Sequence, residues 1–231
     1  MEKGLVVVIS AYNEARFIKG VAENARGYAE EVVVVDDGSK DKTAELAKSA
    51  GATVISHSEN SGKGTALRTG FEYAYQKGYP IIITMDGDGQ HHPEDMPVLL
   101  EHYRKTGAGV VVGCRSRNLK NMPVERFVTN WFTSFLVSLL AGQRIRDSQS
   151  GFRVFDSRVI PFLSFSASHF ATESEVLVEA SRAGFKIAEA PIRTIYGQER
   201  SKQHPLRDTV RFFKFFFRSL FKRHPHPTLS P

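Results

Sequence analysis

Short runs of apolar residues recur along the first half of the chain and alternate with segments of helical character. The runs cover residues 5–9, 32–35, 53–56, 81–85 and 109–113. An apolar run without polar alternation is typical of a strand that is buried on both faces of a parallel sheet. The pattern therefore predicts an α/β fold with an open, mostly parallel sheet whose strands are joined by right-handed crossovers.

Helix signals lie between these runs. Asn13 is a candidate N-cap for the first helix, and Pro93 suits the first position of the fourth. The expected helices cover residues 13–25, 41–50, 65–77 and 93–106. A strand is expected after each of them, which supports the crossover topology.

The pattern changes after Asn118. The elements expected in this half are an amphipathic helix at 127–140, a polar turn at 147–153 that leads to Val154 and Phe155, a helix at 173–183 and an edge strand at 187–195. Pro191 interrupts the last of these, and proline within a sheet is confined to edge strands because it cannot donate a ladder hydrogen bond.

The final segment, residues 207–223, is rich in Phe and has basic residues three or four positions apart. This spacing predicts a helix with one basic stripe, the pattern of an interfacial membrane anchor, although the Phe side chains would equally suit packing on the sheet. We divide the chain into a domain at 1–204, an amphipathic, membrane-interfacial helix at 205–223 and a flexible tail at 224–231.

Composition limits the compartment and the partners. The chain has 231 residues, of which 41% are hydrophobic, and a formal net charge of +6, which fits one globular domain with an anionic partner. Cys114 is the only cysteine, so an internal disulfide is excluded and a reducing, cytoplasmic compartment is compatible. We find no apolar stretch of about 20 residues and no signal segment, and expect no transmembrane helix. The basic residues form no known nucleic-acid motif, so we expect no nucleic acid partner.

Two carboxylates follow the fourth apolar run, in the motif Asp86-Gly-Asp-Gly-Gln90. In an extended segment, side chains two residues apart point the same way, so Asp86 and Asp88 would converge at the carboxyl edge of the sheet. Like charges raise each other's pKa unless a cation separates them, and Mg²⁺ is usually held by one or two carboxylates plus substrate phosphates. The motif predicts a Mg²⁺ or Mn²⁺ site, with a simple acidic turn as the alternative.

Other strand ends bring polar side chains to the same edge, namely Tyr12, Glu14, Asp36, Asp37 and Arg115. In an open α/β sheet, ligands bind outside the carboxyl ends of the strands, and carboxylates there can bind ribose hydroxyls. Together with a metal, these residues predict a site for a nucleoside diphosphate. The first turn lacks G-x-G-x-x-G, and Lys63 is not followed directly by Ser or Thr, so neither a dinucleotide oxidoreductase nor a P-loop is indicated.

Five motifs support a resemblance to a known family: Ser10-Ala-Tyr-Asn-Glu14, Val35-Asp-Asp-Gly-Ser39, Asn60-x-Gly-x-Gly64, Asp86-Gly-Asp-Gly-Gln-His91 and Gly113-x-Arg115. The chain resembles family 2 inverting glycosyltransferases of the GT-A fold, a Rossmann-like open sheet flanked by helices. Four further motifs narrow the resemblance: Asp147-x-x-Ser-Gly-Phe-Arg153, Glu173-x-Glu175, Glu189-x-Pro-Ile192 and Arg200-Ser-Lys202. They are similar to those of the dolichol-phosphate mannose synthase group, which loads a sugar onto a polyprenyl phosphate. Gly87 and Gly89 depart from the Ala and Leu that this group often has, and the Q-x-x-R-W of processive synthases is absent.

The resemblance implies a role for each matching residue. It assigns the nucleoside to Ser10, Tyr12, Glu14 and Asp37, the nucleotide sugar to Asp86, the metal ion to Asp88 and Gln90 beside Asp86, and the acceptor phosphate to Arg115 and Arg126. It assigns the donor phosphates or sugar to Arg200 and Lys202, and the sugar and acceptor side to Ser150 and Arg153. The catalytic residues would be Asp86, Asp88 and Arg115. Lys63 is a further candidate for the donor phosphates, with a solvated position as the alternative, and Glu173 and Glu175 are either sugar-side residues or charges that complement a helix dipole.

The implied reaction moves a hexose, in the first place mannose from GDP-mannose, onto a polyprenyl or dolichyl phosphate with the help of Mg²⁺ or Mn²⁺. The acceptor phosphate is already an anion near neutral pH, so it needs alignment more than a general base. The alternatives are a UDP-sugar donor and a non-catalytic nucleotide-sugar-binding protein. A lipid acceptor implies a peripheral position on the cytoplasmic face of a membrane, through residues 205–223 or through 127–140 with Trp131, and is compatible with a membrane-spanning partner protein.

Overall fold

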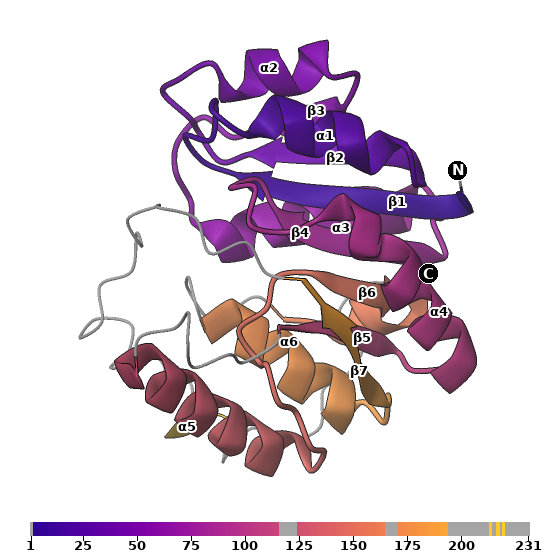
Figure 1. Cartoon of the computed structure of the whole chain (residues 1–231), viewed down its shortest axis with the longest axis vertical. Helices are drawn as coiled ribbons and strands as arrows, with labels where there is room; N and C mark the ends of the chain where they lie inside the picture. Colours follow the sequence, from indigo (N-terminus) through magenta and orange to yellow (C-terminus); the bar gives the residue numbers. More distant parts are fainter. Residues whose placement is uncertain are drawn as a thin grey trace.

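Seven strands form one sheet in the part of the chain that the structure, a computed structural model, describes (Figure 1). That part comprises residues 2–115, 124–164 and 171–193 with Phe213, Phe216, Phe217 and Ser219, and the side chains of 124–127 and 171 lie outside it. The strands are β1 (Glu2–Ala11), β2 (Ala29–Asp36), β3 (Thr53–Ser56), β4 (Ile81–Asp86), β5 (Val110–Arg115), β6 (Arg153–Asp156) and β7 (Ile187–Ile192). Their order is β3-β2-β1-β4-β6-β5-β7, and only β6 runs antiparallel to its neighbours. The predicted mostly parallel α/β sheet is confirmed.

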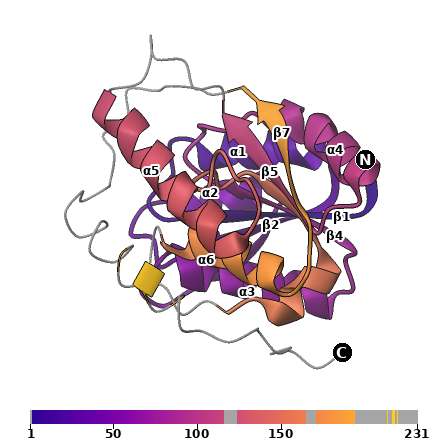
Figure 2. The ribbon, with the colours of Figure 1, turned by 90° about the horizontal axis from the view of Figure 1, so that it is seen from below.

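Helices cover both faces of this sheet (Figure 2). They are α1 (Ile18–Arg26), α2 (Thr43–Ser49), α3 (Lys63–Gln76), α4 (Met96–Thr106), α5 (Val124–Ala141) and α6 (Ala171–Arg182), with short 3-10 turns η1 (Pro93–Asp95) and η2 (Ser157–Phe162). Helices α1, α2 and α4 contribute to one buried apolar cluster, and α3, α5 and α6 contribute to the other. The sheet is therefore the middle layer of three.

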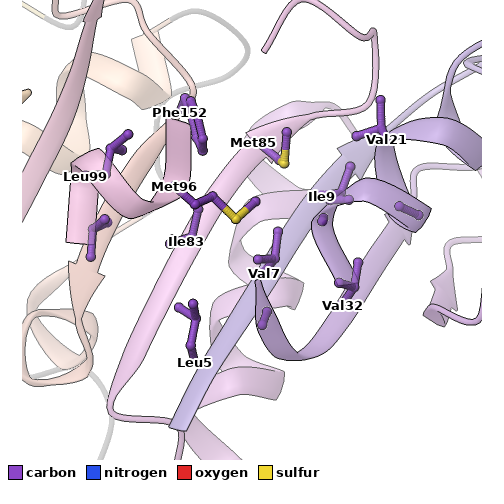
Figure 3. Close-up of a cluster of buried hydrophobic side chains, with 14 of the residues drawn as sticks. Leu5, Val7, Ile9, Val21, Val32, Ile83, Met85, Met96, Leu99 and Phe152 are labelled. Atoms are coloured by element: carbon purple, nitrogen blue, oxygen red, sulfur yellow. The ribbon is translucent and has the colours of Figure 1, made fainter. Parts of the chain in front are cut away.

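Strand β1 shows why its residues are apolar without alternation. Leu5, Val7 and Ile9 point into the cluster below α1 and α4, as Figure 3 shows, whereas Val6 and Val8 belong to the cluster below α3. All five are fully buried, so a polar residue at any of these positions would lie in the core.

Two sequence predictions need correction. Asn13 does not cap α1: its backbone has φ 54°, and the helix begins only at Ile18 after a turn. The segment 153–156 is more than the end of a polar turn, since it forms the antiparallel strand β6 between β4 and β5. Its four residues include two charged ones, so the apolar pattern gave little sign of a strand.

The predicted edge strand is confirmed, since β7 pairs only with β5 in the described sheet and Pro191 lies opposite Cys114. The predictions for Arg200, Lys202, most of the helix 205–223 and the tail 224–231 fall outside the described residues. The domain division at residue 204 stays a prediction.

Candidate functional site

The carboxyl ends of neighbouring strands meet at one edge of the sheet. Ser10 of β1 lies opposite Asp86 of β4 in the strand register, and Ala11 lies opposite Asp36 of β2. Arg115 ends β5, which pairs with β6 beyond β4. The predicted convergence of these strand ends is confirmed.

The loops after β1 and β2 are joined by hydrogen bonds. The backbone N–H of Asn13 donates to Ser39 Oγ, and that of Glu14 donates to Thr43 Oγ1, each at 2.8 Å. Tyr12 and Glu14 are half-buried in this joined loop. These hydrogen bonds hold the two loops together along the β1–β2 side of the carboxyl edge.

The carboxylate of Asp86 lies close to the basic side chains of Lys63 and His91. Lys63 Nζ, at the start of α3, lies 2.6 Å from Asp86 Oδ1 and 2.7 Å from Glu173 Oε1 of α6. His91 Nε2 lies 3.7 Å from Asp86 Oδ2. One ammonium therefore bridges two carboxylates that are far apart in the sequence.

These contacts determine the protonation states of Lys63 and Asp86. Burial alone would raise the pKa of Asp86, but Lys63 and His91 outweigh burial and hold it well below its usual 3.8. Burial would likewise lower the pKa of Lys63, but the carboxylates of Asp86 and Glu173 raise it above its usual 10.5. Lys63 and Asp86 are consequently both charged at neutral pH.

Asp88 lies two residues beyond Asp86 and has a different environment. Its Oδ1 accepts a hydrogen bond from the backbone N–H of Gln90 at 3.0 Å. Burial and the neighbouring carboxylate of Asp86 both raise the pKa of Asp88. The repulsion between the two carboxylates is what a bound divalent cation would relieve.

The donor set fits a hard divalent cation. Asp86, Asp88 and Gln90 offer carboxylate and amide oxygens, the ligands that Mg²⁺ and Mn²⁺ prefer. No group of three or more His, Cys, Asp or Glu side chains that could hold a metal occurs among the described residues. Mg²⁺ in proteins usually keeps water and substrate phosphate oxygens as its remaining ligands, so one or two carboxylates are sufficient protein ligands for it.

Arg115 is fixed by a bidentate ion pair. Its Nε donates to Asp147 Oδ2 at 2.7 Å and its Nη2 donates to Asp147 Oδ1 at 2.8 Å. The backbone N–H of Asp147 donates in turn to Glu189 Oε1 at 3.2 Å. Two planar groups joined in this way hold a guanidinium in one orientation.

Arg153 does not fit the predicted acceptor role. Its side chain is fully buried, and its three guanidinium nitrogens donate to the backbone oxygens of Ser150, Glu173 and Ser148 at 2.7 to 2.9 Å. Burial lowers its pKa to about 10. Ser150 is buried as well, and its Oγ accepts from the backbone N–H of Phe152. Both residues therefore build the turn at 147–153, and Arg153 also ties it to the start of α6.

Asp37 likewise bonds to protein groups. Its carboxylate accepts hydrogen bonds from the backbone N–H groups of Ser61 and Gly62 at 3.0 and 2.7 Å, and it lies 2.7 Å from His57 Nδ1. These contacts fix the loop that leads into Lys63. Asp37 is only 3% exposed, and its predicted contact with a nucleoside stays a prediction.

Sequence reasoning gave too little weight to three residues. The solvated alternative for Lys63 is wrong, because its ammonium is bonded to two carboxylates. Glu173 is 3% exposed and is more than a charge at a helix start, and Asp147 was not recognised as the partner of Arg115. The motif spacings around Glu173 and Asp147 were the available signal, but their partners come from distant segments. The side chain of Arg126 lies outside the described residues.

The fold and the acidic pair at its carboxyl edge define a glycosyltransferase of the GT-A class. The family model for glycosyl transferase family 2 matches residues 6–168, and the chain belongs to this family. The resemblance deduced from the motifs is confirmed.

Relatives and solved structures agree with this assignment. A UDP-N-acetylglucosamine–dolichyl-phosphate N-acetylglucosaminyltransferase of Methanococcus voltae is 34% identical and covers 95% of this chain and 96% of its own. An undecaprenyl-phosphate mannosyltransferase of Micrococcus luteus is 28% identical and covers 81% and 82%. The structure of glucosyl-3-phosphoglycerate synthase from Mycobacterium tuberculosis with Mn²⁺, UDP and glucosyl-3-phosphoglycerate has a TM-score of 0.72 at 20% identity and covers 95% of this chain and 79% of that one. The likeness to that structure shows the fold.

Proposed function

We propose that the protein transfers a hexose from a nucleotide sugar to the phosphate of a polyprenyl phosphate. The observation that carries this proposal is the acidic pair Asp86 and Asp88 at the carboxyl edge, with the fixed cations Lys63 and Arg115 on the same edge. Carboxylates suit a metal-bound diphosphate, and a guanidinium suits a second phosphate. The names of the Methanococcus and Micrococcus relatives support a lipid phosphate as the acceptor.

The acceptor would supply its own nucleophile. A phosphate monoester has a second pKa of about 6, so its oxygen is an anion near neutral pH and no general base is required. This oxygen would form the new bond to the anomeric carbon while the bond to the nucleoside diphosphate breaks, with its electron pair, on the opposite face. The anomeric centre would be inverted. Arg115, oriented by Asp147, would align the acceptor phosphate.

The leaving group carries the greatest charge in this reaction. A divalent cation, when bound, would neutralise the departing diphosphate. Asp88 and Gln90, with Asp86 beside them, are the residues that would hold it. The Mn²⁺ and UDP in the solved glucosyl-3-phosphoglycerate synthase structure support a metal-bound diphosphate in this fold.

Two donors compete. The motifs favoured GDP-mannose, and the mannosyltransferase of Micrococcus supports it at 28% identity. The relative from Methanococcus is 34% identical over nearly the whole of both chains, and its name gives UDP-N-acetylglucosamine. This higher similarity makes UDP-N-acetylglucosamine the first donor to test.

We infer that the protein works on a membrane surface, on the cytoplasmic face. Helix α5 exposes a stripe of large apolar side chains, from 42 to 65% exposed: Val128, Trp131, Phe132, Phe135 and Leu139. On its inner side, Ser134 Oγ accepts a hydrogen bond from the backbone N–H of Ser148, in the turn that carries Asp147. No helix among the described residues is long and apolar enough to cross a membrane.

A two-phase assay tests the reaction. Labelled UDP-N-acetylglucosamine, GDP-mannose and UDP-glucose are offered in turn with polyprenyl phosphate, Mn²⁺ and detergent, and label is counted in the organic phase. We expect lipid label from one donor, its loss with a chelator, and a fall of about a hundredfold or more in Asp88→Asn. Glu23→Gln, on the exposed side of α1, should keep the full rate.

Donor binding is measured in parallel by the shift in melting temperature with each nucleotide sugar. Folded protein that binds a donor but labels no lipid would overturn the lipid acceptor. If that protein also binds its donor equally well with and without metal, the non-catalytic alternative is favoured.

A further inference from the structure

Lys63 and Glu173 share the site with Asp86, and neither takes part in the bond-forming step of the proposed reaction. The ammonium of Lys63 lies at nearly equal distances from the two carboxylates, 2.6 Å from Asp86 and 2.7 Å from Glu173. Glu173 is 3% exposed, and its second oxygen, Oε2, has no hydrogen-bond partner among the described residues. A buried carboxylate oxygen without a hydrogen-bond partner lowers the stability of the fold, so we expect Glu173 to have a function.

Lys63 is the cation in direct contact with the carboxylates of Asp86 and Glu173. The carboxylate of Asp88 lies nearby, and the guanidinium of Arg153, which keeps its charge, donates its hydrogen bonds to backbone oxygens. The ammonium also contacts Oδ1 of Asp86, an oxygen of the acidic pair that would hold a divalent cation. Two cations would thus compete for the same carboxylate.

We propose that Lys63 is the internal counter-cation of the metal site, which holds Asp86 in place in the metal-free enzyme and withdraws to Glu173 when the divalent cation binds. Glu173 provides the second position, because it is already in contact with the ammonium and has a free oxygen to accept it. The proposal rests on the metal site of the proposed function, and it is independent of which sugar or acceptor is used.

The two residues should then affect metal affinity in opposite directions. Without Lys63, a cation no longer has to displace an ammonium from Asp86. Without the charge of Glu173, the ammonium has only Asp86 as a partner and competes more strongly. A charge within about 4–6 Å changes the proton affinity of a carboxylate tenfold or more, and a similar scale is expected for another cation.

The experiment measures Mn²⁺ binding to the full chain without nucleotide, from the electron paramagnetic resonance signal of free Mn²⁺. We expect Lys63→Met to lower the Kd for Mn²⁺ by about tenfold and Glu173→Gln to raise it by about threefold to tenfold. In the double variant, Glu173→Gln should have no further effect, because it acts through Lys63. Circular dichroism shows whether each variant is folded.

The double variant separates this mechanism from a general electrostatic effect. If Glu173→Gln raises the Kd by the same factor with and without Lys63, the two residues act independently and the proposal is overturned. An unchanged or higher Kd in Lys63→Met also overturns it. If Lys63→Met does not fold, an unchanged or lower Kd in Glu173→Gln is sufficient to reject it. Since no transfer is measured, failure of the lipid assay does not alter these outcomes.

Discussion

A side chain at residue 151 would collide with the carboxylate of Asp86: a Cβ added to Gly151 lies 2.7 Å from Oδ2 and 3.0 Å from Oδ1. The turn before β6 therefore packs directly against Asp86, which is confined between this backbone and the ammonium of Lys63.

We predict that Gly151→Ala displaces Asp86 and slows sugar transfer by about tenfold to a hundredfold, because small displacements of reacting groups have effects of this size. Initial rates in the two-phase assay check this. Gly20→Ala is the matched control, since an added Cβ there meets nothing within 4 Å and lies in α1, where alanine should stabilise by about 0.5–1 kcal/mol. A full rate for a folded Gly151→Ala would show that the position of Asp86 is not critical.

The ion pair of Arg115 with Asp147 gives a second prediction. Lysine cannot reproduce a bidentate contact, so Arg115→Lys should lower kcat/KM for the polyprenyl phosphate by about tenfold or more while KM for the nucleotide sugar stays the same. Arg146→Lys is the control: Arg146 donates to Glu189 at 2.7 Å but is 58% exposed, and an exposed pair contributes little. If Arg115→Lys changes only the KM for the nucleotide sugar, Arg115 binds the donor and not the acceptor phosphate.

The apolar pattern was sufficient to predict the sheet but not β6. Strands β1, β2 and β4 are buried on both faces, so their apolar composition alone predicts them as strands. Strand β6 contains Arg153 and Asp156, whose burial is compensated partly by neighbours in the sequence and partly by distant groups. Three backbone oxygens accept from Arg153, and Arg158 and Tyr103 donate to Asp156. Such compensation arises only in the folded chain.

The candidate site shows the same limit. The convergence of Asp86 with the ends of β1 and β2 follows from the parallel topology and was predicted. The contact of Lys63 with Glu173 depends on how α3 and α6 pack on the same face of the sheet, and no spacing in the sequence contains that information.

Glu31 gives a prediction on stability and pH. Burial raises its pKa, but hydrogen bonds from Thr53, Tyr79 and Tyr73 outweigh burial and hold the pKa below its usual 4.5. A carboxylate with a lowered pKa in the folded state stabilises the protein above its unfolded pKa, and this contribution is lost as the pH falls through the folded value.

Glu31→Gln should therefore lower the free energy of unfolding by about 1–3 kcal/mol at pH 7, and the difference from the native chain should shrink below about pH 4. Urea unfolding between pH 3 and 7 measures this. Glu72→Gln is the control, because Glu72 is exposed and its carboxylate pairs with Arg68 one helical turn away. A difference that is constant over this pH range would mean that the charge of Glu31 does not stabilise the fold.

Helix α5 provides the final prediction. Trp131 and Phe135 are 53 and 54% exposed, and their rings stack with centroids 5.9 Å apart. Helices α5 and α2 lie at opposite ends of the molecule (Figure 1), so a membrane on α5 would leave the β1–β2 side of the carboxyl edge open to a nucleotide from solution. Aromatic side chains of this kind bind at the boundary of head groups and acyl chains.

The double variant Trp131→Ser with Phe135→Ser should reduce binding to anionic vesicles by about tenfold or more, since each buried aromatic side chain contributes about 1.5–3 kcal/mol. Trp131→Phe with Phe135→Leu keeps the apolar surface and should retain most of the binding. Co-sedimentation with vesicles measures both. The transfer rate with a short, water-soluble acceptor should be equal in the two variants, because both side chains lie on the exposed face of α5. Equal vesicle binding by both double variants would assign membrane contact to another surface of the protein.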